Sequence, residues 1–200
     1  MLTNVLTILS GAILFLFLFW KRLKEDYSGN EIFSTSFFIL FGIGLGYFTS
    51  KMFLPRGWFW LSFLGSVLGF WVGLAKYHLR FYETFQAVFV SLFPWLFFVF
   101  LNDSVKNSSW ISFSSFVALA LIYSLFYYLE GNYKNFFWYR SGKIGFSGLV
   151  TAGIFFLART VVALFFPFVL SFLGKSETFF SGIIAIIFFL LAINLSRRKT

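Results

Sequence analysis

The sequence has 200 residues, of which 60% are hydrophobic and 12% are charged, and its mean hydropathy is +0.86. Soluble proteins carry roughly 25% charged residues, so the composition excludes an ordinary soluble domain. The net charge of +9 would suggest nucleic acid in a soluble chain, but loop cations in a membrane protein set its orientation and meet anionic headgroups, so we predict no nucleic-acid partner. Without cysteine and with a single histidine, the chain lacks thiol chemistry and the usual transition-metal ligands. We therefore predict no cofactor and no metal.

Continuously apolar stretches separated by short polar loops cover nearly the whole chain. A membrane-spanning helix needs roughly 20 apolar residues, and lipid offers no water to satisfy a backbone that is not helical. The pattern predicts an all-α integral membrane protein, a bundle of seven transmembrane helices that forms a single domain over residues 1–200. The predicted spans are 4–20, 33–54, 58–77, 84–101, 110–129, 146–168 and 178–195.

The basic residues divide unequally between the two sides of this topology. Eleven lie on one side, in the loops after the first, third and fifth spans and in the C-terminal tail, four lie on the other side, and the sixteenth is Arg159. Because cytoplasmic loops are enriched in Lys and Arg, we predict an external N-terminus and a cytoplasmic C-terminus. The predicted location is the plasma membrane, crossed several times.

Small residues recur in the third predicted span, where Gly65, Gly69 and Gly73 form a GxxxGxxxG ladder on one helix face. Such spacing lets a second backbone approach closely in lipid. We interpret the ladder first as internal helix packing. A groove for a lipid chain and a seam between two copies of the chain are the alternatives, and the seam predicts a homo-oligomer.

Arg159 lies well inside the sixth predicted span, whereas Lys51 and Lys76 lie in the last few residues of theirs. A charge at bilayer depth costs at least about 3 kcal/mol unless it finds a partner or water. Three uses fit: snorkelling along its aliphatic stem, pairing with a fixed carboxylate, or binding an anionic lipid headgroup, which guanidinium geometry suits. We predict that Arg159 binds an anionic lipid headgroup, and we propose it as a candidate catalytic residue.

A second polar group lies where the third span ends and the fourth begins. Lys76 and Arg80 share a helix face if the helix continues that far, and they could hold a phospholipid phosphate or act as interfacial anchors. Glu83 is either a counter-ion to Arg80 or an acid that favours the fourth helix dipole. His78 is the second candidate catalytic residue, because imidazole titrates near neutral pH. Lys76, Arg80, Glu83, Tyr47 and Arg140 are the predicted substrate-binding residues.

Several segments follow one another in a recognisable order: FWKRLKE (19–25), YSGNE (27–31), GIGLGY (42–47), LGSVLG (64–69) and RSGK (140–143), followed by a span with Arg159 and a basic tail. This order resembles the prolipoprotein diacylglyceryl transferase family over most of the chain. The resemblance implies transfer of a diacylglyceryl group from phosphatidylglycerol to the lipobox cysteine of a preprolipoprotein. It implies a base that activates the thiol, arginines that hold the phosphate, and two partners, the phospholipid and the preprolipoprotein signal segment.

The family's motifs are altered at several of the positions that matter. Gly44 stands where the family has an arginine, Leu64 stands where it has a histidine, and the fourth-span signature falls on apolar residues 97–100. Two hypotheses follow. The chain is either a divergent transferase that uses Arg159 with Arg80 or His78, or a catalytically inactive membrane protein of the same architecture that binds lipid or a partner helix.

Overall fold

A computed structural model gives the structure of the chain and describes residues 2–135 and 144–197, with side chains from residue 7 onward. These ranges contain long helices and no strand. The helices are α1 (Leu2–Leu23), α2 (Gly29–Phe53), α3 (Trp58–Tyr77), α4 (Phe81–Asn107), α5 (Trp110–Asn132), α6 (Phe146–Phe165) and α7 (Ser176–Arg197), with short 3-10 turns η1 (Pro55–Gly57) and η2 (Tyr133–Asn135).

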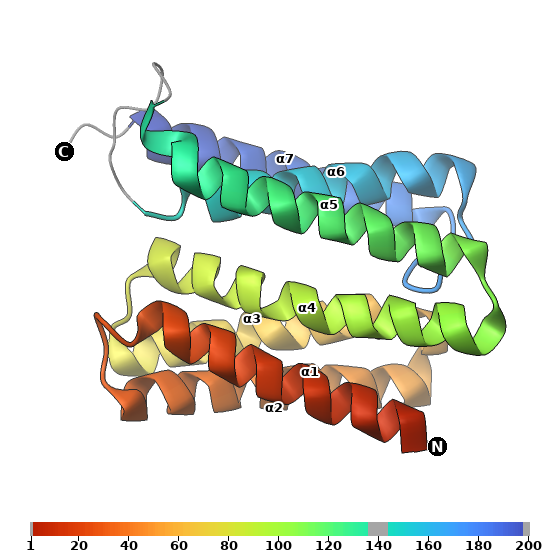
Figure 1. Cartoon of the computed structure of the whole chain (residues 1–200), viewed down its shortest axis with the longest axis horizontal. Coiled ribbons are helices and arrows are strands. Elements are labelled where there is room, and N and C mark those ends of the chain that lie inside the picture. Colours follow the sequence, from red (N-terminus) through yellow and green to blue (C-terminus); the bar gives the residue numbers. More distant parts are fainter. Residues whose placement is uncertain (1, 136–143, 198–200) are drawn as a thin grey trace.

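Successive helices run in opposite directions and form two layers, α1 to α4 in one and α5 to α7 in the other (Figure 1). The start of α1 and the end of α7 lie at opposite ends of the bundle. We call the end that contains the α1–α2 and α3–α4 loops and the end of α7 the basic end, because the predicted cytoplasmic cations belong to it. The other is the opposite end.

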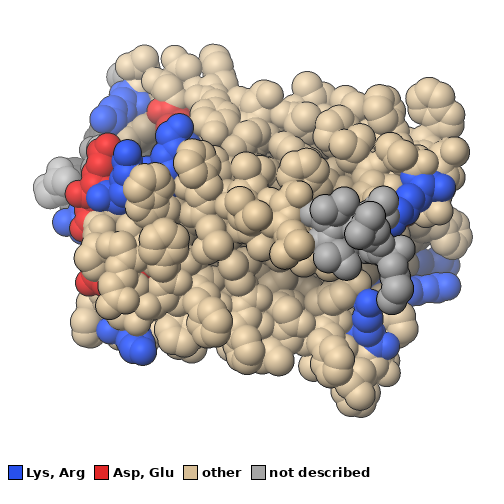
Figure 2. All heavy atoms as spheres, turned by 60° about the horizontal axis from the view of Figure 1, so that its bottom comes forward, with Lys and Arg blue, Asp and Glu red and all other residues tan. Residues whose placement is uncertain are grey.

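The surface of the molecule is that of a membrane protein. Within the described residues, six helices, α2 to α7, are long and apolar enough to cross a bilayer. Charged side chains gather at the two ends of the face shown in Figure 2, and the surface between them is uncharged. Large apolar side chains such as Phe37, Phe48 and Leu68 are more than half exposed, as expected of a surface that contacts lipid. The predicted helical, multi-pass membrane class is confirmed, whereas a seventh crossing and the orientation remain predictions.

The glycines of α3 bring it into backbone contact with α2. A Cβ atom on Gly65 would overlap the carbonyl group of Gly42, and the reverse substitution would overlap the carbonyl group of Gly65. A Cβ on Gly69 would likewise overlap the carbonyl group of Phe38, and Gly73 also faces α2. The ladder is therefore used for helix packing inside the chain. A homo-oligomer through the same residues remains a prediction, and it would have to share a face that α2 already covers.

The sixth helix is shorter than the predicted span 146–168. It ends at Phe165, and the backbone N–H of Phe166 caps it with a 2.7 Å hydrogen bond to the carbonyl oxygen of Val162. Pro167 explains the stop, because proline disfavours helical geometry at the residue before it and has no N–H of its own. The connection to α7 then turns back into the protein, where Ser171 is fully buried.

Candidate functional site

Two clusters of charged and polar side chains lie inside the bundle. The Arg159 cluster consists of Arg159, Glu177, Ser171, Ser181 and Trp60, and the Arg22 cluster consists of Arg22, Glu130, Gln86 and Ser147. Each cluster pairs one arginine with one glutamate. They differ in the end of the bundle at which they lie and in their access to water.

Arg159 of α6 is bound on all three nitrogen atoms of its guanidinium group. Nε and Nη2 donate to Oε1 of Glu177 at 3.0 and 2.6 Å. Nη1 donates to the hydroxyl of Ser171 and Nη2 to its carbonyl oxygen, each at 2.9 Å. The cation therefore meets the carboxylate partner that a charge in an apolar interior requires.

Aromatic rings close the space that remains around this guanidinium group. Its Cζ atom lies 3.7 Å from the ring centre of Phe59 and 4.8 Å from that of Phe172. Arg159 is only 6% exposed. A cation is attracted by such π faces when water is excluded, and the N–H groups by which a guanidinium group binds phosphate already donate to Glu177 and Ser171.

Glu177 is fully buried, and its carboxylate is as well satisfied as the arginine. Oε2 accepts hydrogen bonds from Nε1 of Trp60 at 2.8 Å and from the backbone N–H of Leu173 at 3.2 Å. Oε1 accepts one from the hydroxyl of Ser181 at 2.6 Å, in addition to those from Arg159. Glu177 also lies in the first turn of α7, where the helix dipole favours a negative charge. The cluster thus fastens α3, α6, the α6–α7 connection and α7 to one another.

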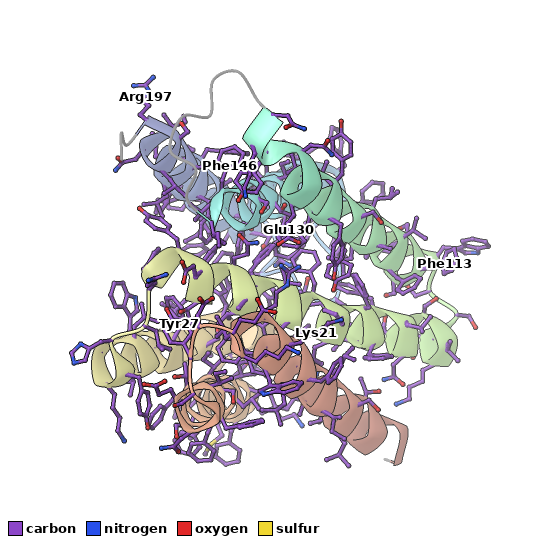
Figure 3. The ribbon with its side chains drawn as sticks, turned by 60° about the vertical axis from the view of Figure 1, so that its left-hand side comes forward. Lys21, Tyr27, Phe113, Glu130, Phe146 and Arg197 are labelled. Carbon is purple, nitrogen blue, oxygen red and sulfur yellow. The ribbon has the colours of Figure 1, made fainter. Side chains whose placement is uncertain are left out.

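The Arg22 cluster joins the two layers near the basic end. Arg22, in the last turn of α1, donates from both terminal nitrogens to the two carboxylate oxygens of Glu130 on α5, with 2.7 Å between Nη2 and Oε2. Nε2 of Gln86 on α4 donates to the same carboxylate at 2.8 Å, and Ser147 of α6 donates to Oε1 of Gln86 at 3.4 Å. Figure 3 shows Glu130 reaching from α5 toward the layer of α1 and α4. About a quarter of each charged side chain is exposed, 27% for Arg22 and 26% for Glu130.

A smaller group fixes the loops at the basic end. The hydroxyl of Tyr27 accepts a hydrogen bond from the backbone N–H of Arg80 at 3.0 Å and donates one to Glu83 at 3.4 Å. The side chain of Arg80 pairs with Glu83 at 3.2 Å, so Glu83 is the counter-ion that was one of its two predicted roles. Burial raises the pKa of the Tyr27 hydroxyl, which keeps it protonated and able to donate.

The predicted catalytic residues lie at different ends of the bundle. His78 is an exposed residue in the left-handed conformation (φ 52°) that ends α3 at the basic end. Arg159 is 13 residues beyond Phe146, at which α6 starts from that same end, and this corresponds to roughly 20 Å along a helix. The structure therefore does not bring Arg159 and His78 together.

The predicted substrate-binding residues are divided in the same way. Lys76 and Arg80 are exposed at the basic end, together with the half-buried Glu83. Tyr47 is exposed near the opposite end, where the ammonium group of Lys51 lies 4.8 Å from its ring centre. Arg140 lies outside the described residues. Within the described part of the chain, no three histidine or acidic side chains come close enough to hold a metal ion.

Glu177 and Glu130, the two acids that complete the clusters, were missed in the sequence analysis. A signal for Glu177 was present, because it is the only acidic residue after position 130 and therefore the only nearby candidate in sequence for a carboxylate beside Arg159. No comparable signal pointed to Arg22 and Glu130, which are 108 residues apart. Comparisons with protein-family models, curated proteins and solved structures give no match.

Proposed function

We propose that this protein is a multi-pass membrane protein that binds anionic phospholipid without transferring it, the catalytically inactive form of the transferase-like architecture. The observation that carries the proposal is the set of hydrogen bonds that already holds Arg159 inside the bundle. Each nitrogen of its guanidinium group already donates within the chain, and Glu177 neutralises its charge. A group transfer from phosphatidylglycerol needs a cation free to take the charge that develops on the departing glycerol phosphate.

The separation of the two predicted catalytic residues supports the same conclusion. In the implied reaction a base takes the proton of the lipobox thiol while cations hold the phosphate of the lipid that the thiolate attacks, so both groups must lie at one site. An exposed His78 at the basic end and a buried Arg159 beyond the middle of α6 cannot contact the same headgroup without a large rearrangement. The cations that remain accessible, Lys76 and Arg80, suit binding better than chemistry.

Lipid binding is supported by the distribution of charge over the molecule. On the face shown in Figure 2, charged residues gather at the two ends and the belt between them is uncharged. Many phenylalanines are exposed on the surface of the molecule. The excess of cations on the predicted cytoplasmic side would attract anionic headgroups of that leaflet, each lysine or arginine contributing about 1 kcal/mol. A plasma-membrane location fits this asymmetry.

One assay separates lipid binding from group transfer. Purified protein is incubated with phosphatidylglycerol labelled in its diacylglyceryl part and with a synthetic lipobox peptide, beside an active diacylglyceryl transferase as positive control. We expect no labelled peptide, and we expect phosphatidylglycerol to remain bound to the protein in mass spectra of the intact complex. Labelled thioether product would overturn the proposal, and its loss in His78→Ala would support the transferase function instead.

A further inference from the structure

A groove opens on the outer surface of the bundle where α2 begins and α3 ends. It has a volume of about 350 Å³ and is lined by Phe33, Ser34, Phe37, Phe38, Lys76 and Tyr77. Since α2 starts and α3 stops at the basic end, the groove lies near the end of the apolar belt, at the level expected for lipid headgroups. Its walls are mainly aromatic, and one of them, Tyr77, is of the amphipathic kind that is enriched at that depth.

Lys76 is the charged residue of this groove, and the described part of the chain gives it no acidic partner. Its ammonium group lies 5.4 Å from the ring centres of both Phe38 and Tyr77, which hold it over the groove without neutralising it. Glu83, which follows Lys76 in the chain, pairs with Arg80, and Glu31, one turn before Ser34 on α2, belongs to the N-terminal cap of that helix. The groove thus combines a positive charge, the hydroxyl of Ser34 and apolar walls.

We propose that this groove binds one anionic phospholipid of the leaflet at the basic end, with Lys76 on its phosphate. The inference rests on the proposed function and names its site. The ammonium group would meet the phosphate as a point charge and the Ser34 hydroxyl would donate to a phosphate oxygen. Phe33 and Phe37, both at least half exposed on α2, would cover the upper acyl chains. A zwitterionic headgroup brings its own cation near Lys76 and is disfavoured there.

Lys51, at the opposite end of the bundle, offers a matched control. Lys51 also holds its ammonium group over an aromatic ring, that of Tyr47 at 4.8 Å, and it also lies near the end of a span. Lys51→Gln removes the same charge from the same helix pair. Because neither Lys51 nor Tyr47 lines the groove, this variant separates an effect of the site from an effect of net charge.

The test measures lipid retained by the full-length protein in detergent, titrated with phosphatidylglycerol or phosphatidylcholine and followed by mass spectrometry of the intact complex. We expect the unmodified protein to prefer phosphatidylglycerol. Lys76→Gln should weaken that binding about fivefold, whereas Lys51→Gln leaves it unchanged and Lys76→Arg retains it. Ser34→Trp, which fills the groove without changing charge, should reduce binding of both lipids. Excess glycerol 3-phosphate should compete weakly, because it lacks the chains that the rings would cover.

Failure of the groove and failure of the proposed function give different results. If phosphatidylglycerol is preferred but Lys76→Gln and Lys51→Gln weaken it equally, or Ser34→Trp has no effect, the groove is not the site and lipid binding lies elsewhere. If the unmodified protein shows no preference for phosphatidylglycerol, both proposals are wrong. Full competition by glycerol 3-phosphate would assign the groove to a soluble phosphate ligand and overturn the lipid assignment.

Discussion

The Arg159 cluster and the Arg22 cluster contain the same ion pair in two different environments. In the first, arginine and glutamate are 6% and 0% exposed, and five further hydrogen bonds surround the pair. In the second, about a quarter of each partner is exposed, and among the described residues Gln86 adds a hydrogen bond to the carboxylate. The number of protein hydrogen bonds rises as water is excluded, because a buried charge left without partners is costly.

The two clusters also join different parts of the molecule. The Arg159 cluster fastens the α6–α7 connection against α3, so it organises the opposite end of the bundle. The Arg22 cluster links α1 to α5, and thereby one layer to the other (Figure 1). We expect a change in the first to threaten folding, and a change in the second to loosen the contact between layers while the helices stay formed.

The largest effect is expected from Glu177→Gln, which keeps the shape of the side chain and removes its charge. Arg159 would then be a buried cation without a counter-ion, so the free energy of unfolding should fall by about 3–5 kcal/mol. Reversible unfolding in mixed detergent micelles, followed by tryptophan fluorescence, measures the change. Glu130→Gln is the matched control in the Arg22 cluster, and equal losses for the two variants would contradict the environmental difference argued above.

Replacing both charges tests whether charge or geometry dominates the Arg159 cluster. Arg159→Met combined with Glu177→Leu removes the ion pair and fills its volume with apolar atoms. Such exchanges are often neutral or stabilising, but Ser171, Ser181 and the indole N–H of Trp60 would lose their partners, so we expect a net loss of about 2 kcal/mol. A loss as large as that of Glu177→Gln alone would show that the hydrogen-bond geometry, and not the unpaired charge, determines stability here.

The sequence predicted the helices better than it predicted the polar contacts between them. Each predicted span overlaps a helix, because hydropathy is a local property. Most differences between predicted and observed bounds lie at the helix ends, where polar residues determine where a helix begins or stops. α2 begins at Gly29 and not at 33, because Ser28 and Glu31 form a capping box, whose S-x-x-E spacing is visible in the sequence. α4 continues to Asn107, beyond the apolar residues that set the predicted limit of 101.

The sequence predicts a polar contact inside the bundle only at Arg159, because a charge inside a membrane span needs a partner. Arg159 required a carboxylate, phosphate or water, and the position of Glu177 just before the predicted seventh span could have singled it out. Which of the three partners it meets depends on how the α6–α7 connection folds back, and no local pattern encodes that. The sequence does not distinguish Arg22 from the other loop cations, because its partner Glu130 becomes its neighbour only when the two layers meet.

A smaller loss is expected from Glu130→Gln in the Arg22 cluster. Arg22 remains partly exposed, so water and headgroups can solvate it once the carboxylate charge is gone, and we expect a loss of about 1 kcal/mol. Amide hydrogen exchange should increase at the ends of α1 and α5 near the basic end and not elsewhere. Glu25→Gln, a change at an exposed acid of the α1–α2 loop, is the control for charge alone, and an identical effect there would remove any specific role for the link between the layers.

The smallest effect is expected at the basic end, where Tyr27, Arg80 and Glu83 contact one another and water can replace their hydrogen bonds. Tyr27→Phe removes the hydroxyl that accepts from the Arg80 backbone and donates to Glu83, two bonds of 3.0 and 3.4 Å. Because water can replace both at the edge of the bundle, the free energy of unfolding should fall by only about 0.5 kcal/mol. Tyr47→Phe, at an exposed tyrosine near the opposite end, is the matched control and should cost less. A loss for Tyr27→Phe as large as that for Glu177→Gln would mean that the loops at the basic end, and not the buried ion pair, limit the stability of the bundle.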